Sequence, residues 1–380
     1  MTRLTGRFQY CVRLAMLLGL CLAGLAQEKT SPPAGPQVKR LTVSAAVPQP
    51  AVDFLAEEPV IDGRLDEKVQ MLPRRPFAFQ VKMNSASPDT AADFRLAYGA
   101  GFLYVFIEVQ SDQLICRDRG YQNGDGFILF LGRPRSDGQP VEESYLLAYH
   151  PTGRPERPFA QIVWRRNQDW PFSPLGERSA FHVLAEKGRI GFEALLRWED
   201  VVPHHPWLSD DLGFNLVLAK AYGQTDVNYL TLSLKPVPGP EAFETYSRLT
   251  FSPATLASGV QSAIVLERHH LTAGQTLRVR IAAASAAPGP EQLNFSFWSG
   301  EGFRLLSQAV SLDLKQGLSV DEAILDTSGL ATGGYSLRWE SRARASSGRA
   351  GITVLPPFDA AAGEKELSDV ASRISPGSAH

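Results

Sequence analysis

The chain has 380 residues, of which 44% are hydrophobic and 21% charged, and its formal net charge is −2. These proportions are typical of a folded protein with substantial cores, and the length suits two domains plus tails. A nearly neutral charge gives no electrostatic reason to expect a nucleic acid or an anionic membrane surface as partner, because both attract clustered cations.

The N-terminus predicts export. Three arginines precede an apolar run from Leu14 to Ala26, which ends in small residues. This run is shorter than the roughly 20 apolar residues that span a bilayer, and its composition is typical of a secretory signal peptide. We therefore expect residues 1–26 to be removed and the mature protein to be secreted or periplasmic. The alternatives are an uncleaved anchor or a lipoprotein modified at Cys21. No later segment of the sequence is long and apolar enough for a second span.

Residues 27–51 are rich in proline, alanine and serine, which predicts a flexible or extended linker. Beyond the signal segment the chain has a single cysteine, Cys116, so no internal disulfide can form. Because Leu114 and Ile115 precede it, we expect Cys116 to be a small buried hydrophobic residue.

Residues 52–253 read as short strands separated by turns, with one short helix at Asp66–Gln70 and a turn near Glu199–Val202. Strands of this length and spacing, without a long helical period, predict an antiparallel β-sandwich. The expected strands are Phe94–Tyr98, Leu103–Val109, Phe127–Leu131, Glu143–Tyr149, Ala160–Trp164, Phe181–Ala185, Arg189–Arg197, Gly213–Ala221, Tyr229–Leu234 and Leu249–Phe251.

A second series of strands occupies residues 263–355 and predicts a small immunoglobulin-like sandwich of about seven strands. The expected strands are Ala263–Arg268, Thr276–Ala283, Leu293–Trp298, Ala309–Leu314 and Tyr335–Ser341. Residues 356–380 are polar and predict a disordered tail. The fold class expected for the whole chain is therefore all-β, with two antiparallel β-sandwiches.

Blocks of the first sandwich carry a resemblance to a known family. In chain order they are Val60–Glu67 (VIDGRLDE), Phe94–Tyr98 (FRLAY), Phe102–Val109 (FLYVFIEV), Gly124–Leu131 (GDGFILFL), Gly191–Trp198 (GFEALLRW), Leu212–Leu216 (LGFNL) and Tyr246–Phe251 (YSRLTF). In type and order they resemble the family-9 carbohydrate-binding modules, whose sandwich is DOMON-like. The resemblance covers just over half of the chain. It implies a non-catalytic module that binds an oligo- or polysaccharide, although one fold hosts several functions.

Two departures from that family pattern matter. The family places a tryptophan after the segment Leu65-Asp66-Glu67, and this chain has none there, so we expect Val69 or Met71 to fill that core position. Ile128 stands where an acidic residue is frequent in the family. An envelope scaffold or interaction protein whose sandwich has lost its sugar is therefore the alternative function.

Sugar recognition needs aromatic faces against the ring and hydrogen-bonding groups around its rim. The segment 164–170 combines two indoles with polar residues, so we predict Trp164 and Trp170 as platforms with Arg166, Asn167 and Asp169 as hydroxyl partners. Core positions for both indoles fit the same pattern. Tyr121 and Trp207 are secondary candidates, whereas Trp198 has the spacing of a structural residue.

No cofactor is expected. Calcium is the alternative, because some relatives carry it and carboxylates suit it, yet turn formation explains each available aspartate; these are Asp62, Asp66, Asp125, Asp210 and Asp211. Some DOMON-like domains hold haem, for which the available axial side chains are Met71, Met83, His150 and His182. No catalytic motif is recognisable, so the chain is not expected to be an enzyme.

Overall fold

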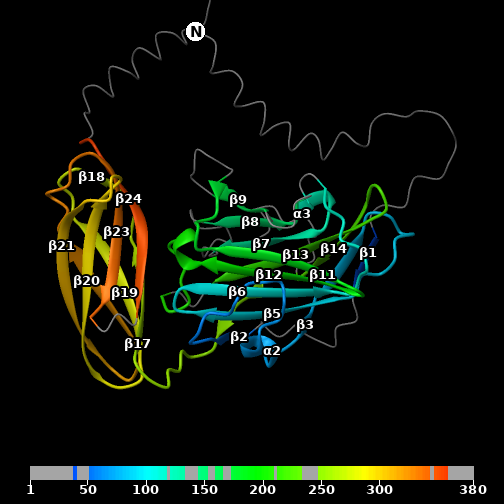
Figure 1. Ribbon diagram of the computed structural model, residues 1–380, viewed down its shortest axis with the longest axis horizontal. Helices are drawn as coiled ribbons and strands as arrows, with labels where there is room; N and C mark the ends of the chain where they lie inside the picture. The colour runs from blue at the N-terminus through cyan, green and yellow to red at the C-terminus, as the bar shows by residue number, and fades with distance from the viewer. Residues whose placement is uncertain are drawn as a thin grey trace, which may run out of the picture. The chain divides into compact units, whose positions relative to one another are not determined.

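The computed structural model describes residues 37–40, 51–117, 120–132, 144–152, 159–165, 173–208, 212–232, 247–342 and 346–357 (Figure 1). Strands dominate this part of the chain and the helices are short, which confirms the predicted all-β class. The segments predicted as signal peptide and C-terminal tail lie outside the described residues, except for 356 and 357. No helix within the described ranges has the length and apolarity to cross a membrane.

The larger sheet of the first sandwich is antiparallel throughout. Its strands, in spatial order, are β1 (Gln37–Arg40), β4 (Phe79–Lys82), β14 (Asp226–Thr231), β13 (Gly213–Tyr222), β7 (Gly126–Gly132), β8 (Tyr145–His150), β9 (Phe159–Arg165) and β10 (Ser173–Pro174), with β15 (Ser247–Arg248) also paired to β13. β1 lies inside the segment predicted as a linker. Its four residues pair with β4, so that segment contributes a strand to the sheet.

The smaller sheet packs against the larger one. Its strands, in spatial order, are β11 (Ala180–Glu186), β12 (Arg189–Arg197), β6 (Phe102–Val109), β5 (Ala92–Gly99), β2 (Ala51–Phe54) and β16 (Thr250–Phe251), with β3 (Arg75–Pro76) also paired to β5. The helices α2 (Glu67–Gln70) and α3 (Gly120–Asn123) and the 3₁₀ turn η2 (Trp198–Asp200) lie between strands. These positions confirm the short helix and the turn predicted from the sequence.

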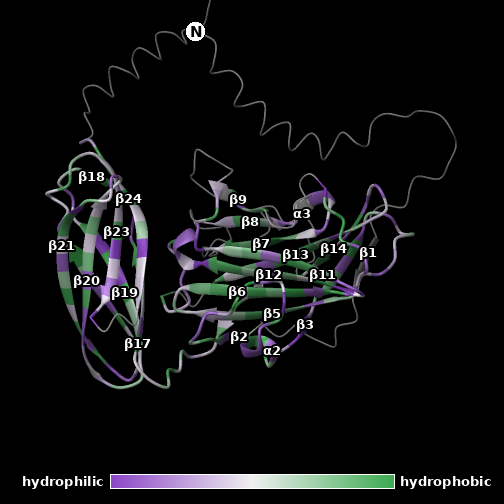
Figure 2. Cartoon of the chain, viewed as in Figure 1, coloured by the Kyte–Doolittle hydropathy of each residue, from purple (hydrophilic) through white to green (hydrophobic). Residues whose placement is uncertain are grey.

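The core between the two sheets is aromatic and aliphatic. Phe127 stacks on Tyr149 with 4.6 Å between ring centroids, and Phe192 reaches the same cluster from the smaller sheet. Figure 2 shows β6 as an almost unbroken hydrophobic strand, and nearly all of its residues are buried. Its second face is covered too, because Val69 and Leu72 of the 55–72 segment pack on it. This segment positions the candidate site described below.

The second sandwich consists of a three-stranded and a five-stranded sheet. The strands of the first are β17 (Val260–Leu266), β19 (Leu277–Ser285) and β22 (Gly317–Leu325); those of the second are β18 (His270–Thr272), β24 (Ser347–Leu355), β23 (Gly333–Ser341), β20 (Gly289–Ser299) and β21 (Arg304–Leu314). Phe295, Phe297 and Leu337 are fully buried in its core. β18, β22 and β24 have no counterpart among the five strands predicted here.

One prediction about the core is wrong. Cys116 was expected to be buried, but its side chain is exposed. Leu114 and Ile115 are the half-buried residues of that segment, and the backbone N–H of Ile115 is fixed by Asp125 at 2.8 Å. The chain turns outward immediately after this contact, so apolar neighbours in sequence did not place the thiol inside.

Candidate binding site

The turn at residues 61–66 is shaped by glycine and by local hydrogen bonds. Gly63 adopts φ +84°, and a Cβ on it would lie 2.7 Å from the Cβ of Leu184, so only glycine fits. Asp62 Oδ1 accepts from the N–H of Arg64 at 2.9 Å, and Asp66 caps α2 by accepting from the N–H of Lys68 at 2.8 Å. Asp62 and Asp66 therefore fix the backbone of the turn through hydrogen bonds to its N–H groups.

Glu193 clamps this turn onto the smaller sheet. Its carboxylate accepts hydrogen bonds from the N–H groups of Gly63 at 2.7 Å and Asp62 at 2.9 Å, and from the Tyr104 hydroxyl at 2.7 Å. The side chain is fully buried. Burial raises the pKa of Glu193 to about 7, while these three donors oppose the rise.

Gly191 lets the turn approach the sheet closely. A Cβ at Gly191 would lie 2.4 Å from the carbonyl oxygen of Gly63. In the strand register Gly191 stands between Leu184 of β11 and Glu108 of β6. The missing side chain at this position lets the Gly63 carbonyl lie against the outer face of the sheet, and the turn borders a pocket there.

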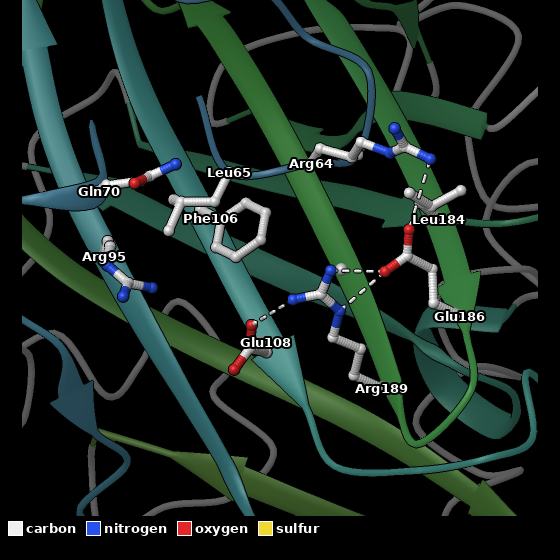
Figure 3. A pocket seen from close by; sticks show the side chains of 11 residues that line it. Arg64, Leu65, Gln70, Arg95, Phe106, Glu108, Leu184, Glu186 and Arg189 are labelled. Atoms are coloured by element: carbon white, nitrogen blue, oxygen red, sulfur yellow. Dashed lines mark hydrogen bonds and ion pairs between the residues drawn. The ribbon is translucent and has the colours of Figure 1, made fainter. Parts of the chain in front are cut away.

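This pocket has a volume of about 580 Å³ (Figure 3), which is within the range of small-molecule sites. The turn and α2 form one wall, and β5, β6, β11 and β12 contribute the remaining lining. The lining residues are Gly63, Arg64, Leu65, Gln70, Arg95, Phe106, Glu108, Leu184, Glu186, Arg189 and Gly191. Apolar groups and convergent polar groups therefore meet in one place.

Most charges in the pocket are paired. Arg189 binds Glu186 at 2.5 Å and lies 3.9 Å from Glu108, and Arg64 lies 3.5 Å from Glu186 (Figure 3). Glu108 is also bound at 2.9 Å by Arg74, at the margin of the pocket. The hydrogen bond and charge of Arg189 lower the pKa of Glu186. Both carboxylates thus lie beside cations, and for Glu186 this favours the charged form.

Arg95 differs from the other two arginines. Only 7% of its side chain is exposed, whereas 66% of Arg64 and 54% of Arg189 is. Its Nε donates to the carbonyl of Leu72 at 3.3 Å, and its Nη1 lies 3.9 Å from Asp93 without a hydrogen bond among the described residues. Figure 3 shows its guanidinium directed toward the space beside Phe106 and Glu108.

The sugar-binding segment predicted from the sequence is largely outside the described residues. Arg166, Asn167, Asp169 and Trp170 all lie there. The backbone of Trp164 ends β9, opposite Leu146 of β8; its side chain is outside the description, as is that of Tyr121 in α3. These candidates stay predictions.

Trp207 is described and is buried, with 6% exposure. Its ring contacts those of Phe54 and His205, at centroid distances of 6.2 and 5.3 Å. The structure therefore gives this indole a place in the core, where it offers no open face to a sugar. Trp198 is structural as predicted, since it is buried and donates to the carbonyl of Gly99 at 3.0 Å.

The core position for which Val69 and Met71 were the candidates is taken by Val69. Its side chain is fully buried under the 55–72 segment, while Met71 is 91% exposed. Of the two residues proposed for this core position from the sequence, the structure selects Val69.

The aspartates considered as calcium ligands have other partners where they are described. Asp62 and Asp66 hold the turn, as stated above. Asp125 is fully buried and accepts from Lys220 Nζ at 3.0 Å and from the N–H of Ala221 at 2.7 Å. Asp210 and Asp211 lie outside the described residues. Across the described part of the chain, no three His, Cys, Asp or Glu side chains cluster as metal ligands.

The side chains considered for haem are dispersed. Met71 and Met83 are exposed, at 91% and 59%. His150 is buried against Phe159, and burial lowers its pKa. His182 stands opposite Glu193 in the β11–β12 ladder, on the same face as the pocket. Nothing in these positions favours an axial pair over packing.

The pocket residues were missed by sequence reasoning. Arg95 and Glu108 belong to the β5–β6 hairpin, whereas Arg189 belongs to β12, far away in the sequence. Charged residues on the outer face of a strand usually contact only water. The strand register brings them together. A weak signal existed in Gly191, because a glycine inside a strand often marks a close approach of another backbone.

No family model and no curated protein matches the chain. Among solved structures, a family-9 carbohydrate-binding module from Caldicellulosiruptor kristjanssonii matches in its complexes with cellotriose and with glucose. These two matches cover 54% of this chain and 95% and 97% of the module, with identities of 14% and 16% and a TM-score of 0.39. A DUF4785 family protein from Legionella pneumophila matches over 73% of this chain and 59% of its own, at 10% identity and a TM-score of 0.21. Values this low establish neither a shared family nor a shared ligand.

Proposed function

We propose that this protein binds a saccharide without cleaving it, and that the pocket on the outer face of the smaller sheet is the binding site. The observation that carries the proposal is the composition of the pocket. The partly exposed Leu65 and Leu184 supply apolar surface above the buried Phe106, and Arg, Glu and Gln side chains surround it. A pyranose ring presents C–H groups on its faces and hydroxyls on its rim, so it needs both kinds of surface.

The sequence resemblance to carbohydrate-binding modules supports the same function. Its motif segments build part of the pocket: the turn of Val60–Glu67 forms a wall, and β12, which contains the block that begins at Gly191, contributes to the lining. The residues of the motif segments determine the course of the backbone around the pocket, and the side chains that line it bind the ligand.

The arginines beside the two pocket carboxylates, Glu108 and Glu186, favour binding without catalysis. A glycosidase needs one carboxyl group with a raised pKa as general acid. Arg189 lowers the pKa of Glu186 instead, and Glu108 is held between Arg74 and Arg189. Carboxylates engaged in this way suit hydroxyl acceptance better than proton donation.

The test is a glycan array with the full chain, followed by calorimetry on the glycans that bind. Arg64→Ala and Gln70→Ala remove exposed polar groups from the wall, and each should weaken binding about three- to tenfold. Arg304→Ala, an exposed arginine of β21, is the matched control and should leave the affinity unchanged. An array without any bound glycan would favour the scaffold alternative.

Binding that is weakened by Trp164→Ala and Trp170→Ala, but is unaffected by Arg64→Ala and Gln70→Ala, would support the function and move the site to the segment 164–170.

We further propose that the protein acts after export, with a mature chain that begins near Gln27. N-terminal sequencing of the protein from culture medium or periplasm tests this, and an intact Met1 in the membrane fraction would contradict it.

A further inference from the structure

We propose that the saccharide is acidic, and that Arg95 receives a carboxylate on the rim of one sugar unit. The inference rests on the proposed function and specifies its ligand class. It starts from the charge of the pocket lining, which includes the guanidinium groups of Arg64, Arg95 and Arg189 against the carboxylates of Glu108 and Glu186. The lining thus carries one positive charge in excess.

The two carboxylates do not satisfy Arg95. Glu186 is engaged by Arg189 and Arg64, and Glu108 by Arg74 and Arg189. Among the described residues no ion pair links either of them to Arg95, whose neighbour of opposite charge is Asp93, 3.9 Å away. At that distance the contact is an ion pair without a hydrogen bond.

Arg95 also donates few of its possible hydrogen bonds to the described residues. A guanidinium carries five N–H groups, and here Nε alone donates to a described residue, over 3.3 Å to the carbonyl of Leu72. The side chain is more than nine-tenths buried, and its Nη1 is buried with no hydrogen-bond partner among the described residues. A buried, charged donor without an acceptor is costly, and a carboxylate that enters the pocket would reduce this cost.

A carboxylate fits this donor better than a hydroxyl. The planar fork of arginine matches the two oxygens of a carboxylate, and a hydrogen bond between two charged groups is roughly twice as strong as a neutral one. Phe106, in the register position directly opposite Arg95, is buried, so the partly exposed Leu65 and Leu184 of the lining supply apolar surface for the C–H face of the same sugar. A uronic acid combines a planar carboxylate with such a face.

The experiment is calorimetry on the full chain with three probes: trigalacturonate, its methyl ester, and a sulfated neutral trisaccharide. The ester has nearly the same shape as the acid but no charge. We expect trigalacturonate to bind at least about tenfold more tightly than its ester, and more tightly than the sulfated probe, whose tetrahedral anion matches the fork less well. Added salt should weaken the binding of the acid and leave that of the ester unchanged.

Arg95→Lys keeps the positive charge but loses the planar fork. It should reduce trigalacturonate binding about tenfold and leave ester binding within about twofold. Arg304→Lys serves as the control for an arginine outside the pocket. If Arg95→Lys does not fold, the comparison of acid and ester and their salt dependence on the unmodified chain decides the matter without a variant.

Each outcome bears on one of the two proposals. Equal affinity for the acid and the ester would overturn the acidic ligand and leave saccharide binding intact, as would tight binding of only neutral glycans on the array. Preference for the sulfated probe would overturn the carboxylate. Failure of every glycan and every probe would overturn the proposed function itself.

Discussion

Glu193 shows how one buried residue serves both the fold and the site. It replaces water for two backbone N–H groups of the turn and for the Tyr104 hydroxyl, so the turn cannot leave the sheet without exposing these groups. The cost of burying its charge appears in the raised pKa, about 7. Turn and sheet are therefore held by a group whose charge changes near neutral pH.

This pKa predicts a pH dependence of stability. Since the carboxyl group binds its proton more tightly in the folded state than in the unfolded state, where its pKa is near 4.5, its contribution is lost as the pH rises from 4.5 to 7. The loss should be on the order of 2–3 kcal/mol. Glu193→Gln keeps the shape and carries no charge, so its unfolding free energy should lack this component.

The measurement is urea unfolding of the wild type, of Glu193→Gln and of Glu340→Gln, an exposed control, at several pH values. The difference between wild type and Glu193→Gln should change across pH 4.5–7, and that for Glu340→Gln should stay flat. Parallel curves for Glu193→Gln and wild type would show that Glu193 titrates as it does in the unfolded chain.

Lys220 is the second buried charge with structural consequences. Its side chain is 1% exposed, and its Nζ donates to Asp125 and to the carbonyls of Gln113 and Ala221, at 2.9–3.1 Å. These oxygens surround the ammonium group of Lys220. Burial raises the pKa of Asp125, and Lys220 opposes that rise.

Removing the ammonium should therefore be costly. Lys220→Met leaves Asp125 buried without its cation, and we expect a loss of about 3–5 kcal/mol in the free energy of unfolding. The exposed Lys315→Met should cost less than about 0.5 kcal/mol. Asp125→Asn combined with Lys220→Met should recover part of the loss. A cost for Lys220→Met no larger than that of the control would show that the pair is not essential to this part of the fold.

At the scale of elements, the turn at residues 61–66 depends on a glycine that two constraints require. Gly63 and Gly188 both adopt positive φ, +84° and +82°, but a Cβ would meet Leu184 at 2.7 Å only at Gly63, whereas nothing lies within 4 Å of Gly188. A substitution at Gly188 therefore tests backbone strain alone, whereas one at Gly63 tests backbone strain together with close packing.

Gly188→Ala should cost about 1 kcal/mol, from the left-handed backbone alone. Gly63→Ala should cost at least about 2–3 kcal/mol, because the turn must also move away from β11. Thermal and urea unfolding of both variants test the difference, and saccharide binding should fall only for Gly63→Ala. Equal costs would mean that the turn is not packed against the sheet as described.

The strands themselves were largely predictable, for a physical reason. β5 and β6 combine β-branched and aromatic residues with a glycine turn, and their predicted bounds differ from the observed ones by at most two residues. β22 was missed because most of its positions are exposed, which weakens the hydrophobic pattern. β24 was missed too; it contains two glycines, and half or more of its residues lie outside the core.

The site was not predictable in the same way. Hydrophobic alternation indicates which face of a strand is buried, but says nothing about which outward residues of different strands become neighbours. The pairing of Phe106 with Arg95 on one side and Glu193 on the other is a property of register. The sequence pointed instead to segment 164–170, where aromatic and polar residues adjoin in sequence.

At the scale of the whole molecule, we propose that the first sandwich binds a saccharide on the outer face of its smaller sheet. The competing location, residues 164–170, follows β9 of the larger sheet. A measurement that reports on the whole chain at once can separate the two, because ligand contact slows amide hydrogen exchange where it orders the backbone.

Hydrogen–deuterium exchange on the full chain, with and without the tightest glycan from the array, is that measurement. The account predicts slower exchange in the turn and helix at residues 62–70 and in the hairpin at residues 184–191, and loss of this protection in Arg64→Ala. Protection confined to residues 159–173, with 62–70 and 184–191 unchanged, would contradict it.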